Sequence, residues 1–454
     1  MIDVSVLVAG GVLLVGALIL VVLHGRRRDI VATAESAATT GSTPVIRTGE
    51  PDSAATLAAT EAVGEAMIDA GYSGVTIRRA LEDIATVNGL PSSQVLVFPT
   101  ALLVSARGEG QHRTGAITSG ERRLLLSQVD ELQRTVDAAR KGVLDPDSTI
   151  RRIQWIREMT PPYGPVLRVV GYVVLCAGLA VLLGSSWTGV ALSAGLGVIV
   201  GAALLAGERL PTGFGALLTV GIAFLVALVV FLLLRAGFGP GILAALIAPL
   251  VVLLPGVLLT TAALELSTGQ MISGAGRLAA GAWQLVLLAA GIVTAGVIAG
   301  VPDFDFTENP EALGPAAPWI AVAVFGLGIA VHLCVPRRSI LWMLLVLFMA
   351  YAAQVIAAPF LGGVLSAFVG ALVVVPVTAL VARQPRGPAA LVSFMPAFWL
   401  LVPGALGLVG VTDLLHGDTS GLNSIVATLS TMVAISLGVL AGSVVSNRME
   451  RPAL

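Results

Sequence analysis

Two acidic residues, Glu265 and Asp413, each follow a proline–glycine pair inside a long apolar stretch. The pairs are Pro255-Gly256 and Pro403-Gly404, and each acid comes ten positions after its proline. A carboxylate in an apolar segment is costly unless it is paired or hydrated, so it is a functional candidate by default. A proline–glycine pair removes a helix hydrogen bond and permits an unwound turn, whose helix ends carry partial charges. This combination predicts a binding site for a small ionic solute, with proton exchange at the two acids.

Both features also have ordinary structural explanations. A proline can simply kink a helix, and an acid near a helix end can lie at the membrane interface. The polar side chains near the two breaks favour a binding role. We predict substrate contacts at Pro255, Gly256, Thr260, Thr261, Pro403, Gly404, Thr412 and Asn423, and proton coupling at Glu265 and Asp413. No metal-ligand spacing is present in these stretches, and we expect neither a metal nor a cofactor.

The two proline–glycine pairs belong to an internal repeat. At the offset that separates them, Gly215 matches Gly363, Arg235 matches Arg383, Gly239-Pro240 matches Gly387-Pro388, and Gly269 matches Gly417. So many matches in one ungapped register indicate two homologous halves, each with a broken helix.

The composition is that of a polytopic membrane protein. Of the 454 residues, 56% are hydrophobic and 12% are charged, which is far from the usage of soluble domains. The formal net charge of -1 gives no reason to expect a nucleic-acid partner. Ten apolar segments have about the length that a bilayer requires: Val166–Leu183, Trp187–Ala206, Thr212–Leu234, Gly241–Leu264, Leu278–Val301, Ala317–Val335, Ile340–Ala358, Leu361–Ala382, Ala389–Val411 and Leu422–Ser446.

Basic residues alternate between the loops that join these segments. One set of loops carries Arg209, Arg277 and Arg337-Arg338, whereas the acidic segment Asp303–Glu311 lies in the other set. Basic loops remain in the cytoplasm, which also places the C-terminus there. Five helices per half is an odd number, so the second half must enter from the opposite face. We therefore predict an all-α polytopic membrane protein, a ten-helix bundle of two inverted five-helix repeats with broken helices.

The predicted repeats are residues 166–301 and 317–446. An extracytoplasmic loop, 302–316, joins them, and a cytoplasmic tail, 447–454, follows. At the other end of the chain, the apolar run Val4–Leu23 precedes Arg26-Arg27-Arg28. No basic residue comes before this run and no small-residue cleavage site follows it, which favours a retained anchor over a cleaved signal peptide. We predict a transmembrane anchor at 1–28 with its N-terminus outside, and a linker at 29–52.

Residues 53–165 predict a small cytoplasmic α+β domain. Helical periodicity covers 54–71, 75–88 and 121–141, and another helix starts at Asp145 or Asp147. Strands are predicted at 94–98 and 101–107, with a third at 114–118 after the turn Gly108-Glu109-Gly110. On paper, His112 could combine with Ser105, Ser119, Asp130 and Glu131 in a catalytic triad. No nucleophile-elbow or phosphate-loop spacing supports this, so we predict a regulatory or docking domain without enzymatic activity.

Three segments carry a family resemblance. The first, Met67–Ser105, includes Asp69-Ala70-Gly71 and Asn88-Gly89-Leu90-Pro91. The second combines Leu254-Pro255-Gly256 with Ser273-Gly274-Ala275-Gly276-Arg277-Leu278, and the third is Pro396–Gly404. They resemble the threonine/serine exporter family, and the likeness extends from about Thr60 to Ser446. It implies a bacterial inner-membrane exporter of small hydroxy amino acids, driven by the membrane potential or the proton gradient. Two-chain relatives are linked to succinate export, and the family often has Asp where this chain has Glu265.

Three functions therefore stay open. The first is proton-driven export of threonine or serine by antiport, which the polar side chains near the breaks favour. The second is export of a dicarboxylate, for which Arg235, Arg277 and Arg383 are candidate cationic groups. The third is a membrane scaffold or sensor without transport, which would not require an inverted repeat. The expected partners are the amino acid, protons and the lipid bilayer, with no nucleic acid, and a homo-oligomer stays open.

Overall fold

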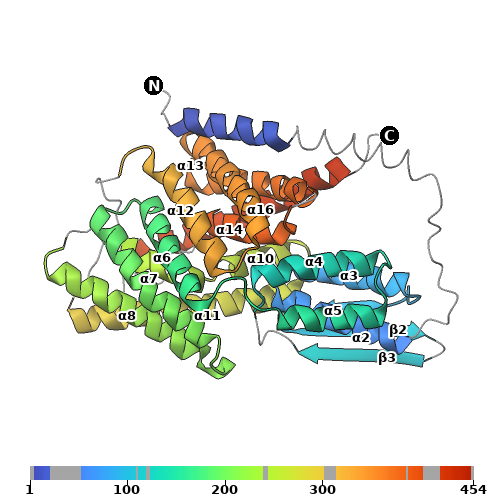
Figure 1. Cartoon of the computed structure of the whole chain (residues 1–454). Coiled ribbons are helices and arrows are strands. Elements are labelled where there is room, and N and C mark those ends of the chain that lie inside the picture. Colours follow the sequence, from blue (N-terminus) through green and yellow to red (C-terminus); the bar gives the residue numbers. More distant parts are fainter. Residues whose placement is uncertain are drawn as a thin grey trace. The chain divides into compact units, whose positions relative to one another are not determined.

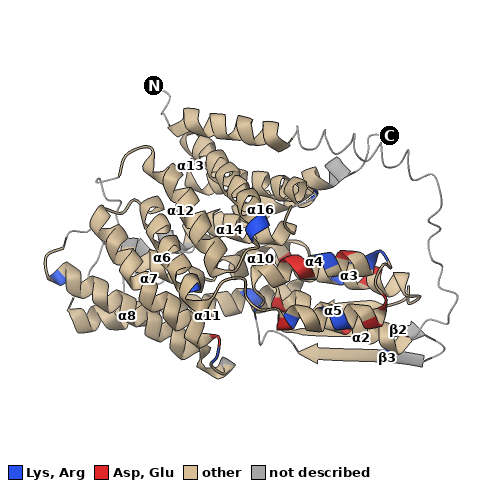
Figure 2. Cartoon of the chain, in the orientation of Figure 1, with Lys and Arg blue, Asp and Glu red and all other residues tan. Residues whose placement is uncertain are grey.

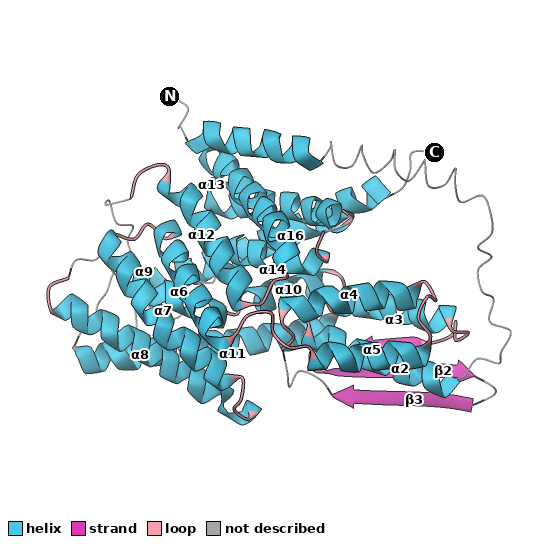
Figure 3. Cartoon of the chain, viewed as in Figure 1, coloured by secondary structure: helices cyan, strands magenta, loops and turns pink. Residues whose placement is uncertain are grey.

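The computed structural model describes residues 5–20, 53–108, 111–118, 123–238, 244–300, 313–384, 387–401 and 420–450. Within them lie six helices that are long and apolar enough to cross a membrane, or seven when one bent pair counts as a span. A small three-stranded sheet completes the fold (Figures 1 and 3). The chain divides into two compact units, the first made of Met1–Val12, Pro161–Thr378 and Leu391–Leu454, the second of Leu13–Thr160 and Ala379–Ala390. The prediction of a mostly helical membrane protein with a small sheet is confirmed.

The second unit contains the α+β elements in the order that the sequence predicts. They are α2 (Ser53–Asp69), α3 (Gly74–Val87), β1 (Gln94–Val97), β2 (Ala101–Gly108), β3 (Gln111–Thr118), α4 (Leu126–Arg140) and α5 (Pro146–Glu158). The strands form one antiparallel sheet in the order β1-β2-β3, with Val95 opposite Val104 and Leu102 opposite Ile117. The helix predicted from Glu121 begins only at Leu126, and the third strand begins earlier than predicted, at Gln111.

Local chemistry explains where these helices begin. The Ser73 side chain accepts a hydrogen bond from the Thr76 amide and caps α3, and Asp145 caps α5 in the same way through the Ser148 amide. Ile77, Leu81 and Ile84 of α3 recur at helical spacing and are buried. Figure 2 shows that charged residues gather on α3, α4 and α5. Each of these helices therefore has one face in the core and one in water.

The first unit holds the apolar helices. They are α6 (Pro165–Leu182), α7 (Trp187–Gly207), α8 (Gly215–Arg235), α9 (Ala244–Ile247), η3 (Ala248–Leu253), α10 (Gly256–Ser267), α11 (Met271–Ala299), α12 (Ala317–His332), α13 (Ile340–Ala382), α14 (Ala390–Leu401) and α16 (Ser420–Glu450), with the ends of α13 and α14 reaching into the second unit. Within the described residues, the apolar helix Ser5–Leu20 is shorter than a full span. Figure 2 shows few charged residues on the apolar helices.

The longest helix, α13, is interrupted at Gly362, whose φ of 74° and ψ of 176° are not helical. Its 43 residues would extend roughly 65 Å at about 1.5 Å per residue, about twice the hydrocarbon thickness of a bilayer. The interruption falls next to the junction between the predicted segments Ile340–Ala358 and Leu361–Ala382. These two segments leave a predicted connection at Pro359-Phe360, which is wrong, because both residues lie within helical backbone and the interruption comes at Gly362.

The predicted break at Pro255-Gly256 is confirmed. The segments Ala245–Leu253 and Gly256–Ser267 are bent by 53° relative to each other. Pro255 stands at the start of α10, where the absence of its amide hydrogen costs no helical bond. The second pair, Pro403-Gly404, lies outside the described residues.

Helices α6 and α12 pack closely through glycines. A Cβ on Gly171 would lie 2.8 Å from the His332 amide nitrogen, and one on Gly178 would lie 2.5 Å from that of Phe325. The earlier glycine of α6, Gly171, contacts the later residue of α12, His332, and the later glycine, Gly178, contacts the earlier residue, Phe325. The two helices therefore run antiparallel. They are the first predicted helices of the two halves.

A second glycine contact occurs in both halves. A Cβ on Gly291 of α11 would lie 2.7 Å from the Val220 carbonyl oxygen and 2.9 Å from the Ala223 Cβ, both on α8. A Cβ on Gly438 of α16 would lie 2.5 Å from the Phe368 carbonyl oxygen and 2.9 Å from the Ala371 Cβ, both on α13. The residues contacted in the two halves, Val220 and Phe368, are separated by the same offset as Pro255 and Pro403. The same holds for Ala223 and Ala371. The spacing between Gly291 and Gly438 differs from this offset by one residue. The sequence repeat is therefore also a repeat of packing.

Candidate functional site

The broken span is held by side chains from two neighbouring helices. A break leaves carbonyl oxygens without their regular helical partners. The Tyr172 hydroxyl of α6 donates to the Pro249 carbonyl oxygen at 2.6 Å, and Gln284 Nε2 of α11 donates to the Leu253 carbonyl oxygen at 2.7 Å. These contacts fix the unwound turn in place.

A buried acid lies at the far end of the same span. Glu265, in the last turn of α10, is 0% exposed. Its Oε2 accepts a 2.7 Å hydrogen bond from the Ser273 hydroxyl and lies 3.2 Å from Nε of Arg277, which is itself only 7% exposed. A buried carboxylate of this kind needs such partners, because leaving it uncompensated costs several kcal/mol, about 3–5 when one partner of a buried pair is removed. The Glu265–Ser273–Arg277 cluster is thus a charged site inside the first unit.

A tight turn brings the three side chains together. Gly269, with φ of +80°, takes the left-handed conformation between α10 and α11, and the Gln270 amide donates to the Glu265 carbonyl oxygen at 2.8 Å. A Cβ on Gly274 would lie 2.7 Å from Leu266 Cγ and 3.0 Å from the Ala262 carbonyl oxygen, so only glycine lets α11 approach α10 this closely.

The Ser273-Gly274-Ala275-Gly276-Arg277 motif thus has a physical explanation. Gly274 sets the distance between the helices, while Ser273 and Arg277, four residues apart, lie on the same face of α11 and reach Glu265. The prediction that Arg277 lies in a loop before a helix starting at Leu278 is wrong. Helix α11 begins at Met271, and the ion pair with Glu265 allows the arginine to be buried inside it.

The other predicted residues of the first half surround the break. Pro255, Gly256 and Thr260 are buried, and Thr261 is partly buried. The Thr260 hydroxyl has no hydrogen-bond partner within the described part of the chain, and its carbonyl oxygen accepts from Ser436 of α16 at 3.2 Å. Polar groups of α10 therefore face both α11 and a helix of the second half.

The predicted residues of the second half cannot be compared with this site. Pro403, Gly404, Thr412 and Asp413 lie outside the described residues. Asn423 lies in α16, but its side chain is not among those described. Their roles stay predictions.

Sequence reasoning missed a second ion pair, between the buried Arg168 and the exposed Glu208. Arg168 of α6 donates to both carboxylate oxygens of Glu208, at 3.0 and 2.5 Å, and to the His332 carbonyl oxygen at 3.1 Å. The sequence could have indicated this pair, because Arg168 lies near the start of one apolar segment and Glu208 directly follows the end of the next. Two consecutive membrane helices bring these two ends to the same side of the membrane. Arg235 is different: it is exposed at the end of α8 and donates to the Ala299 carbonyl oxygen at 2.9 Å.

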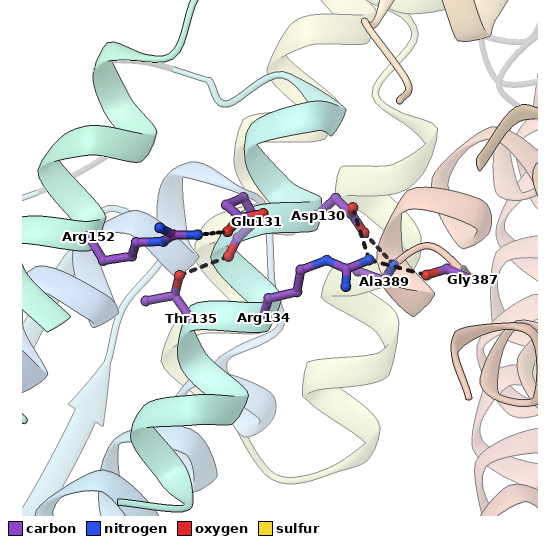
Figure 4. A network of polar contacts seen from close by, with 7 residues as sticks. All are labelled: Asp130, Glu131, Arg134, Thr135, Arg152, Gly387 and Ala389. Carbon is purple, nitrogen blue, oxygen red and sulfur yellow. Dashed lines mark hydrogen bonds and ion pairs between the residues drawn. The ribbon is translucent and has the colours of Figure 1, made fainter. Parts of the chain in front are cut away.

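Three of the residues considered for a catalytic triad have other partners. Glu131 pairs with Arg152 (Figure 4), and the Ser105 hydroxyl accepts from Thr114. Asp130 pairs with Arg134. Ser119 and the His112 side chain are not among the described parts of the chain.

Comparison with known proteins identifies the family. The model of the family described as "Putative threonine/serine exporter" matches residues 59–299, more than half of the chain. The chain belongs to the threonine/serine exporter family. It is 26% identical to "Threonine/serine exporter" of Corynebacterium glutamicum over 72% of this chain and 68% of the relative. It is 25% identical to "Probable threonine/serine exporter" of Mycobacterium tuberculosis (strain ATCC 25618 / H37Rv) over 95% and 83%. No solved structure matches the chain.

Membership in the threonine/serine exporter family settles the broad class. The family is one of transporters and not of enzymes, and the chain is a multi-pass membrane protein. The matched range includes the α+β elements, the break at Pro255-Gly256 and the Glu265–Ser273–Arg277 cluster.

Proposed function

We propose that this protein exports threonine and serine across the bacterial inner membrane, driven by the proton-motive force. The observation that carries the proposal is the Glu265–Ser273–Arg277 cluster, a buried acid and base at the end of a broken span in a chain of the threonine/serine exporter family. An ionisable group buried in a membrane segment is a candidate for a functional site by default. Glu265 takes up and releases the coupling proton, with Asp413 in the equivalent role in the second half.

The transporter architecture that we propose is a pair of inverted five-helix repeats. The antiparallel crossing of α6 and α12 and the repeated glycine contacts of α11 and α16 support it, since an inverted repeat requires both. The interruption of α13 at Gly362 supports counting that helix as two spans. In such folds the substrate site lies at the interface of the repeats, beside the unwound helices.

On its path through the protein the substrate then passes both breaks. Pro255, Gly256, Thr260 and Thr261 would line the site from the first half, with the threonines meeting the hydroxyl of the amino acid. Pro403, Gly404, Thr412 and Asn423 would line it from the second half. The α+β domain and the C-terminus would lie in the cytoplasm and the N-terminus outside, as the alternation of basic loops predicts.

Dicarboxylate export is less well supported by the contacts. A dicarboxylate needs two cationic or amide-rich sites, yet Arg277 is paired with Glu265, and Arg235 is exposed and bonded to a helix end. An acid beside the base disfavours a doubly negative solute and suits a zwitterion.

The test is counterflow in proteoliposomes made with the full-length protein. Vesicles loaded with unlabelled solute are diluted into labelled threonine, serine or succinate. We expect accumulation of threonine and serine, enhanced by an imposed pH gradient. Accumulation of succinate alone would replace the proposal with dicarboxylate export, and no accumulation of any of the three would refute it.

A further inference from the structure

The charges on α10 and α11 match those of a free amino acid. Glu265 supplies a carboxylate and Arg277 a guanidinium, with 3.2 Å between Oε2 and Nε, and both are buried. A zwitterionic amino acid carries an ammonium and a carboxylate on one carbon, so it can stand between the two groups and pair with each. Arginine binds carboxylates through a planar fork of donors, which makes it better suited to this role than lysine.

We infer that Glu265 and Arg277 together form the receptor for the amino acid's charged end, with the ammonium at Glu265 and the carboxylate at Arg277. This inference rests on the proposed function. Binding opens the direct ion pair and replaces it with two, so the buried cluster has no net charge before or after binding. That balance matters because an uncompensated charge in a membrane interior is strongly unfavourable.

The same arrangement accounts for proton antiport. A proton on Glu265 removes the negative charge that the substrate ammonium requires, so proton and amino acid compete for one carboxylate. The charged group that faces Glu265 from α11 is Arg277, and Ser273 donates to the carboxylate. From α16, Ser436 contacts the Thr260 carbonyl oxygen, and residues 426–446 of that helix include no ionisable side chain. Stimulation of threonine transport by an imposed pH gradient should therefore disappear in Glu265→Gln.

Crossed ligand preferences test the assignment. Counterflow of labelled threonine by the full-length protein is inhibited with unlabelled threonine, with threoninol, which lacks the carboxylate, and with 2,3-dihydroxybutyrate, which lacks the ammonium. In wild type, threonine should be the best inhibitor. In Arg277→Gln, threonine should lose about 30-fold or more in apparent affinity, as expected when one partner of a buried charge pair is removed, and threoninol should become its equal. In Glu265→Gln, 2,3-dihydroxybutyrate should become the equal of threonine.

Control variants distinguish a failure of the Glu265–Arg277 receptor from a failure of the proposed export function. Arg235→Gln removes an arginine whose contact is a helix-end carbonyl, and it should keep the wild-type order of inhibitors. If Arg277→Gln does not fold, Arg277→Lys keeps the charge, and threoninol should gain on threonine to a smaller extent. Wild-type counterflow with the same inhibitor order in every variant would refute the receptor and leave the exporter intact. Absence of counterflow in wild type would refute the exporter itself.

A second inference comes from the segment 387–389, which directly precedes α14 and belongs to the second compact unit. Gly387, Pro388 and Ala389 are buried, and none of them offers the side-chain oxygen that usually caps a helix start. Asp130 of α4, which is 1% exposed, accepts a 2.8 Å hydrogen bond from the Ala389 amide (Figure 4). Arg134 pairs with Asp130 and points its guanidinium at the Gly387 carbonyl oxygen, each at 3.4 Å.

The segment is shaped for this contact. A Cβ on Gly387 would lie 2.9 Å from the Val381 carbonyl carbon and 3.2 Å from the Gln384 carbonyl oxygen, so the chain turns tightly against the end of α13. A carboxylate at a helix N-terminus is also favoured by the helix dipole. We propose that Asp130 is a positioning residue, a cap that the α+β domain supplies to the start of α14. Along the chain this helix leads to Pro403-Gly404.

Hydrogen exchange on the full-length protein tests the cap. In Asp130→Ala, the amides of residues 387–393 should exchange on the order of tenfold faster or more, as expected when a hydrogen bond to a charged group is lost. Glu131→Ala is the matched control, because the neighbouring Glu131 pairs with Arg152 inside the domain, and it should leave these amides unchanged. Asp130→Asn keeps an acceptor and should restore much of the protection. Equal exchange in Asp130→Ala and wild type, or equal acceleration by both alanine variants, would refute the cap.

Discussion

The crossing of α6 and α12 offers a sharp test of the packing between the two halves, through the substitution Gly178→Ala. The added Cβ would lie 2.5 Å from the Phe325 amide nitrogen and 3.0 Å from both the Phe325 Cα and the Ala321 carbonyl oxygen. All three are backbone atoms, so no side chain can rotate away. Non-bonded carbon contacts lie at about 3.5–4.0 Å, so the helices must separate by roughly 1 Å.

The expected cost follows from that displacement. Overpacking a well-packed interior costs about 1–3 kcal/mol, which for a chain of this length lowers the apparent unfolding midpoint by roughly 1–3 °C. Gly195→Ala is the matched control, since nothing lies within 4 Å of its added Cβ. There the midpoint should stay the same or rise, because alanine favours the helix by about 1 kcal/mol over glycine at an unhindered site.

The assay is thermal unfolding of detergent-purified protein, followed by the loss of monodisperse material in size exclusion. Threonine counterflow is measured on the same preparations, and it should fall in Gly178→Ala if this contact forms the interface of two moving halves. Equal midpoints for Gly178→Ala and Gly195→Ala would mean that α6 and α12 do not approach each other as closely as the structure shows.

Three further predictions concern the break, the topology and the α+β domain. Gly256→Leu places a branched side chain on the buried backbone of the break, so threonine counterflow should fall strongly at normal membrane expression; normal counterflow would make the break only a kink. A topology reporter fused near Asp305 should read outside and one near Arg386 inside, and an inside signal at Asp305 would remove the inverted arrangement. Burial raises the pKa of Glu61 above its ordinary value of 4.5, so the stability that this residue contributes is present below pH 4.5 and is lost as the pH rises through its folded-state pKa. Glu61→Gln should therefore flatten the pH dependence of the domain's unfolding midpoint above pH 4.5 and raise the midpoint near neutrality, and an unchanged profile would contradict this.

Sequence patterns predicted the α+β elements well, because their helices and strands have one apolar and one polar face. Ile77, Leu81 and Ile84 mark such a face through their spacing alone. The break at Pro255 was predictable for a different reason, since a proline has no amide hydrogen to give to a helix. Both the spacing of apolar residues and the position of a proline act on the chain locally, so the sequence alone predicts the structure at these places.

The position of Arg277 was not predictable in this way. A hydropathy pattern treats an isolated arginine as the end of an apolar segment, because an unpaired charge does not remain in a membrane helix. What permits its burial is a partner on another helix, Glu265, together with the close approach that Gly274 allows. Periodicity identifies the face on which a residue lies, but not the helix that this face meets.

The Asp130 cap suggests why an exporter built from two similar halves would carry its α+β domain on one side. The repeat matches Gly387-Pro388 with Gly239-Pro240, so the first half has a sequence equivalent of the capped segment. In an inverted arrangement these two segments lie at opposite faces of the membrane, and a cytoplasmic domain can reach only the one before α14. In that arrangement the hydrogen bond between Asp130 and the Ala389 amide would belong to the second half alone. Releasing that hydrogen bond would loosen one half alone, which gives the domain a means of acting on transport without touching the substrate.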